Sequence, residues 1–142
     1  MPAIARRRLS TWLLCACGVW LVGLGLYFIF VRPALLPEDL RFMGATQPRI
    51  RAELPGLERW LAHVFTVLGG FIAGAGVLTI FVAVAALPSR PPVARSAIAL
   101  SGAFTVGLMS ATNFSLDSDF RWVLLAPVVG WLAALISYLA GH

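Results

Sequence analysis

The sequence predicts an all-α integral membrane protein, a bundle of four transmembrane helices with a short helical outer-face cap. Hydrophobic residues make up 60% of the 142-residue chain, and charged residues make up 12%. Four stretches, at 12–31, 60–87, 96–112 and 122–140, contain no charged residue. Each is close to the length of about 20 residues that crosses a bilayer. Since four such helices use most of the chain, residues 1–142 are expected to form a single domain.

Helices at about 11–32, 56–87, 95–112 and 121–140 follow from these stretches, which leaves the outer cap at 33–55. Within the cap, Pro37 is followed by two acids, and the segment closes at Gly44. Proline in a first turn, acids near the helix N-terminus and glycine after the last turn are the start and stop signals of a short helix. A second start recurs at Pro55, so we expect one or two interfacial turns over the outer mouth of the bundle.

Charge is distributed unequally between the two predicted sides. The arginines before the first helix and between the second and third helices have no acid beside them, and the positive-inside rule places them in the cytoplasm. They are Arg6, Arg7, Arg8, Arg90 and Arg95. All six acidic residues share the other side with the remaining six arginines, so that side has no net charge. Both termini are therefore predicted to be cytoplasmic.

The first apolar stretch admits two other interpretations. Three arginines followed by an apolar run resemble a signal peptide, but the run continues to Val31 and meets Arg-Pro rather than a cleavage site. The segment ending at Cys17 resembles a lipobox, yet the residues after it stay apolar where a lipoprotein needs a polar tether. We therefore expect a retained helix. Cys15 and Cys17 would lie about 200° apart around it, too far round to form a disulfide.

Glycine faces are the most distinctive feature of the first two helices. Gly18 and Gly25 are one heptad apart and share a face. Gly70 and Gly74 match the small-xxx-small pattern that lets transmembrane helices approach closely. These four glycines are the predicted helix-packing positions.

The second helix also carries a polar stripe that leads from its outer end to these glycines. His63 is an ionisable group near the membrane and hence a candidate ligand or proton site, with a histidine hydrogen-bonded at the interface as the competing interpretation. The third helix is the least hydrophobic and would complete a pocket beneath the cap. The hypothetical ligand-binding set is His63, Arg59, Thr66, Ser101, Thr105 and Arg121.

The outer charges could form an anion site or pair with one another, and pairing is favoured because opposite charges are present in equal numbers. No complete catalytic motif, metal-ligand set or phosphate loop occurs, so no catalytic residue, metal or cofactor is assigned. The net charge of +5 does not indicate a nucleic-acid partner, because the cytoplasmic arginines flank helix ends where they contact lipid head groups. Membrane lipid is the expected partner, with a protein partner or homo-oligomer in addition.

The glycine-rich segment 59–78, with its Leu-Gly-Gly-Phe-Ile-Ala-Gly-Ala-Gly core, resembles the second helix of DoxX-like and related uncharacterised four-helix bacterial membrane proteins. The resemblance covers about one helix and the helix count, and the long outer segment and short third helix depart from it. It implies a small bacterial inner-membrane protein, sometimes a partner of redox enzymes. It transfers no catalytic residue.

Three functional hypotheses follow. The first is a non-enzymatic accessory or assembly subunit that docks through its glycine-rich helix faces. The alternative is binding or transport of a small or lipid-like molecule in the pocket under the outer cap. The third is a membrane enzyme that uses His63 and outer carboxylates, which has the least support because no nucleophile motif accompanies them.

Overall fold

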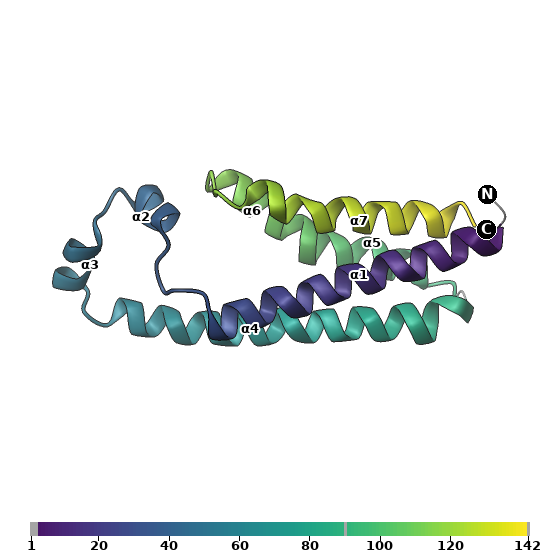
Figure 1. Ribbon diagram of the computed structural model, residues 1–142, viewed down its shortest axis with the longest axis horizontal. Coiled ribbons are helices and arrows are strands. Elements are labelled where there is room, and N and C mark those ends of the chain that lie inside the picture. The colour runs from purple at the N-terminus through teal and green to yellow at the C-terminus, as the bar shows by residue number, and fades with distance from the viewer. Residues whose placement is uncertain (1–2, 90, 142) are drawn as a thin grey trace.

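The computed structural model, which describes residues 3–89 and 91–141, confirms the predicted fold class. Four helical segments are long and apolar enough to cross a membrane: Arg8–Phe30, Leu57–Ser89, Ala94–Ser115 and Arg121–Leu139. They pack as a bundle, with two short helices at one end (Figure 1). The chain is a small integral membrane protein with four candidate spans.

The helices follow the predicted order with shifted ends. The first begins earlier than residue 11 and the third continues past residue 112, because both predicted ends were placed at a change in polarity rather than at a helix stop signal. The elements are α1 (Ala3–Phe30), α2 (Pro37–Met43), α3 (Gln47–Glu53), α4 (Leu57–Phe81), α5 (Ala94–Gly102), α6 (Leu108–Ser115) and α7 (Arg121–Leu139). In the cap, α2 ends as predicted at Gly44, whose φ of 60° is the left-handed conformation that glycine adopts without strain.

The bundle is built around α1. One side of α1 packs along α4, its other side packs on α7, and α5 and α6 pack on α7 (Figure 1). The first turns of α1 and the last turns of α7 lie at the same end of the bundle, opposite the cap of α2 and α3 (Figure 1). Arg90, one of the arginines predicted to be cytoplasmic, lies outside the described residues, and the orientation in the membrane stays a prediction.

The contact between α1 and α4 depends on two pairs of glycines. A Cβ at Gly69 would lie 2.6 Å from the Gly25 carbonyl oxygen, and a Cβ at Gly76 would lie 2.6 Å from the Gly18 carbonyl oxygen. Within each helix the two glycines are seven residues apart, so both pairs fall on one seam between the antiparallel helices. Backbone meets backbone along this seam, which only glycine permits.

The buried core lies toward the end that holds the first turns of α1. It contains side chains from α1, α5, α7 and the segments around residues 83–87 and 106, among them Leu14, Leu21, Ile98 and Trp131. Many large apolar side chains outside the core are exposed, as expected of a surface that faces lipid.

Two stretches depart from α geometry. The second span passes through a π turn, Val82–Ala86, and a short 3₁₀ turn, Leu87–Ser89. Pro88 accounts for this change, since it has no N–H to donate and its ring excludes the carbonyl four residues earlier. The third span contains a second π turn, Ala103–Gly107, between α5 and α6.

Trp131 joins α7 to α5 inside the bundle. Its ring lies against Gly102, where a Cβ would overlap the indole, and its Nε1 donates a hydrogen bond of 2.8 Å to the carbonyl oxygen of Ile98. The side chain is 4% exposed. Gly102 therefore provides the space in which the indole reaches a backbone acceptor across the helix pair.

Candidate functional site

The outer cap is fastened to the loop between α6 and α7 by one glutamate. The Glu38 carboxylate accepts a hydrogen bond from the Ser118 hydroxyl at 3.0 Å and another from the Asp119 backbone N–H at 3.0 Å. Ser118 is fully buried, and its hydroxyl also accepts the Phe120 N–H at 3.1 Å. Glu38 thus has two partners on a loop 80 residues away, and these bonds hold α2 against the end of α7.

Arg32 occupies the space beneath α2. Its side chain is 9% exposed, and its guanidinium donates to the Asp39 carboxylate at 3.2 Å and to the Pro33 carbonyl at 2.9 Å. The guanidinium carbon lies 3.6 Å from the ring centroid of Phe65 on α4 and 5.3 Å from that of Phe28. The Arg32 guanidinium therefore contacts aromatic faces and pairs with a carboxylate, and these contacts compensate its positive charge near the membrane boundary.

The remaining cap charges also pair. Arg41 and Asp119 lie 2.9 Å apart, and the hydrogen bond from this carboxylate, followed by its Coulomb attraction, raises the pKa of the Arg41 guanidinium. Asp117, at a φ of 51° that aspartate tolerates, pairs with Arg121. The other pairs are Arg49–Glu53 and Arg51–Glu58. Five of the six outer arginines thus pair with acids, as the sequence favours, whereas Arg59 is exposed and has no ion pair within the described residues.

Neither of the two hollows described below is lined by a residue of the predicted ligand-binding set. Arg59, His63 and Thr66 lie exposed along α4, and the Thr66 hydroxyl donates to its own helix. The Thr105 hydroxyl donates to the Ser101 carbonyl at 2.6 Å, in a span that packs on α7 rather than α4. Arg121, the sixth residue of the set, is engaged within the loop as described above.

The four predicted packing glycines divide into two groups. Gly18 and Gly25 lie in the α1–α4 seam, whose partners on α4 are Gly69 and Gly76. The other two, Gly70 and Gly74, face outward, and a Cβ at either position would meet no other atom within 4 Å. They line an open hollow of about 540 Å³ on the outer face of α4, together with Val67, Phe71, Ala75 and Leu78. This hollow is hereafter the α4 groove.

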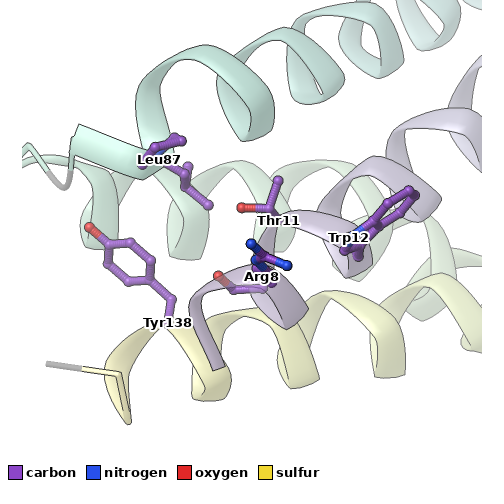
Figure 2. Close-up of a pocket in the computed structure, with 7 residues that line it drawn as sticks. Arg8, Thr11, Trp12, Leu87 and Tyr138 are labelled. Atoms are coloured by element: carbon purple, nitrogen blue, oxygen red, sulfur yellow. The ribbon is translucent and has the colours of Figure 1, made fainter. Parts of the chain in front are cut away.

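A second cavity, of about 300 Å³, lies at the opposite end from the cap. Figure 2 shows Arg8, Thr11 and Trp12 reaching it from α1, Leu87 from the end of the second span and Tyr138 from α7. Its other lining residues are Ser10 and Pro88. We call this the basic cavity.

The basic cavity has a buried floor and an exposed rim. Ser10, Leu87 and Tyr138 are 2–3% exposed, whereas Arg8 and Trp12 are exposed. No hydrogen bond or ion pair joins the Arg8 guanidinium to another residue within 3–89 or 91–141. The sequence places Arg8 among the cytoplasmic arginines that contact lipid head groups, but it does not predict a cavity beside this residue. The spacing of Arg8, Thr11 and Trp12, three and four residues apart, was the available signal that they share a face.

No family model, curated protein or solved structure matches this chain. Within the described parts of the chain, no group of three or more His, Cys, Asp or Glu side chains is arranged to hold a metal ion.

Proposed function

We propose that this protein is a non-enzymatic assembly subunit that docks a transmembrane helix in the α4 groove. The observation that carries the proposal is the outward position of Gly70 and Gly74, beside a Phe71 side chain that is 75% exposed. The intramolecular contact of α4 is made by the other glycine pair, so packing within the chain does not explain this second small-residue face. Close approach of a partner helix would explain why small residues lie on this outward face.

The shape of the groove favours a second copy of the same chain as the partner. Small residues form a hollow next to the ridge of Phe71 and Leu78, which is 65% exposed. In a two-fold symmetric pair, the ridge of each copy can enter the hollow of the other, because the same patch serves both sides of the contact. A homodimer through α4 is therefore the assembly that we propose.

The competing hypothesis places a small or lipid-like ligand under the outer cap. It has less support, because the carboxylates of Glu38 and Asp39 and the guanidinium of Arg32 are engaged with cap and loop groups. The hypothesis of an enzyme that uses His63 has the least support, since the carboxylates near the outer end of α4 pair with arginines. The bacterial inner membrane, the cytoplasmic termini and the DoxX-like resemblance belong to the proposal as expectations.

Association in lipid vesicles tests the proposal. Donor-labelled and acceptor-labelled full-length protein, reconstituted together at rising lipid dilution, should show energy transfer that falls along a dimer dissociation curve. Gly74→Leu fills the α4 groove and should weaken association by about tenfold or more, as loss of close helix contact implies. Gly23→Leu is the matched control, because Gly23 is also exposed and a Cβ there meets nothing within 4 Å.

Equal energy transfer in the wild type and Gly74→Leu, or an equal loss in both leucine variants, would contradict docking through the groove. A wild type that stays monomeric at every dilution would contradict the homodimer. In that case, co-purification of a stoichiometric membrane protein that Gly74→Leu releases and Gly23→Leu retains would identify a different partner for the same groove.

A further inference from the structure

The two ends of the bundle differ in how their charges are compensated. All six acidic side chains lie at the cap end, where each has an arginine, serine or backbone partner. At the other end lie Arg6, Arg8 and Arg95, with no acidic side chain beside them. Arg6 donates to the Ala140 carbonyl oxygen at 3.2 Å, and no acidic side chain of the described residues pairs with it. This end attracts anions.

The basic cavity provides a localised site at this end of the bundle where an anion could bind. The Arg8 guanidinium offers a planar set of donors that fits two oxygens of one phosphate or carboxylate group. Ser10, Thr11 and Tyr138 add hydroxyls to the wall. The donor available to phosphate oxygens is therefore the Arg8 guanidinium at the exposed rim of the cavity.

The position of the cavity indicates that its occupant has an apolar part. Arg8 begins the first candidate span, Ser89 ends the second and Leu139 ends the fourth, so the cavity lies at the level where three spans leave the apolar layer. Trp12, 74% exposed on the rim, is a residue type that favours this interface. The walls formed by Leu87 and Pro88 are apolar. A phosphate held here would have its attached chains directed along the lipid-facing surface.

We propose that the basic cavity binds one phosphate-bearing anion, whose phosphate contacts the Arg8 guanidinium. An anionic phospholipid head group and a water-soluble phosphate ester share this chemistry. The apolar wall and the depth of the cavity favour the phospholipid. This site is independent of the α4 groove, which lies on another helix and is lined by no ionisable residue.

Native mass spectrometry of the delipidated full-length protein in mild detergent tests the site. The protein is titrated separately with phosphatidylglycerol, phosphatidylcholine and glycerol 3-phosphate. One equivalent of phosphatidylglycerol should bind about tenfold or more tightly than phosphatidylcholine. Arg8→Gln should weaken that binding by about tenfold, the loss typical of one charge-assisted hydrogen bond. Arg95→Gln removes an exposed charge from the same end but outside the cavity, and should change binding less than about twofold.

A phospholipid and a water-soluble phosphate ester give different results in this titration. Tight phosphatidylglycerol binding that glycerol 3-phosphate does not displace identifies a lipid site, whereas competition by glycerol 3-phosphate at equal concentration identifies a site for soluble phosphate esters. Equal effects of Arg8→Gln and Arg95→Gln, or equal affinity for both lipids, would overturn the proposal. If Arg8→Gln does not fold, Arg8→Lys keeps the charge and removes the planar fork, and unchanged binding in that variant would overturn the proposed bidentate contact. Vesicle energy transfer should not change in either Arg8 variant, which separates this site from the dimer.

Discussion

Neighbouring glycines on α4 provide a direct test of the packing described here. Gly69 and Gly70 are adjacent in the sequence and share a helix, yet only Gly69 faces α1. A Cβ at Gly69 would lie 2.6 Å from the Gly25 carbonyl oxygen and 2.8 Å from an Ile29 side-chain carbon, whereas one at Gly70 would meet nothing within 4 Å. Gly69→Ala and Gly70→Ala therefore add the same methyl group to opposite environments.

The magnitude follows from the geometry. The two helix backbones must separate by about 0.4 Å before the new methyl at position 69 is even 3.0 Å from that oxygen. Backbone cannot move aside as a flexible side chain can, so the seam must open along its length. Overpacking of this kind costs about 1–3 kcal/mol. At position 70 no such cost arises, and alanine gains up to about 1 kcal/mol from its higher helix propensity.

The assay is equilibrium unfolding of full-length protein transferred from a mild detergent into rising fractions of sodium dodecyl sulfate, at protein concentrations where copies do not associate. Gly69→Ala should lower the free energy of unfolding by about 1–3 kcal/mol, while Gly70→Ala should leave it unchanged or raise it slightly. Equal destabilisation by both changes would refute the assignment of the two faces. So would a Gly70→Ala variant less stable than Gly69→Ala.

Three further changes test other contacts. Gly102→Ala should lower the free energy of unfolding by about 1–3 kcal/mol, because the methyl overlaps the indole of Trp131 and the buried ring cannot move aside. Trp131→Phe should lower it by about 1–2 kcal/mol through loss of one interhelical hydrogen bond and a small void, and unchanged stability would contradict a role for that bond. Glu38→Ala removes the acceptor of the buried Ser118 hydroxyl, so trypsin should cleave the cap faster than in Glu53→Ala, which breaks only an exposed pair.

Much of the architecture could be predicted from the sequence because the bilayer restricts it so strongly. A span must be helical and about 20 apolar residues long, so four transmembrane helices can be identified in the sequence without any knowledge of their packing. The short helix α2 was also predictable, since Pro37, two acids and Gly44 are local signals. The start of α3 at Gln47 was not singled out, and its proline lies inside the first turn at position 48.

The packing partners were harder to predict, because a glycine pattern shows that a helix can approach another but not which helix approaches it. The α4 helix carries two overlapping patterns: Gly69 and Gly76, seven residues apart, and Gly70 and Gly74, four residues apart. Both permit close contact. The choice between them depends on where Gly18 and Gly25 lie when α1 turns back on α4, which is a property of the tertiary structure.

The same limit explains why the basic cavity could not be found in the sequence. Its residues come from three spans, and its floor depends on Leu87, which follows a π turn that an ordinary helix would not contain. In contrast, the cap charges could be expected to pair, since equal numbers of opposite charges in short loops have few other partners. Arg8 differs from the arginines of the cap in a way that composition does not show. Arg8 lies at the end of the bundle away from the six acidic side chains, and none of them pairs with it.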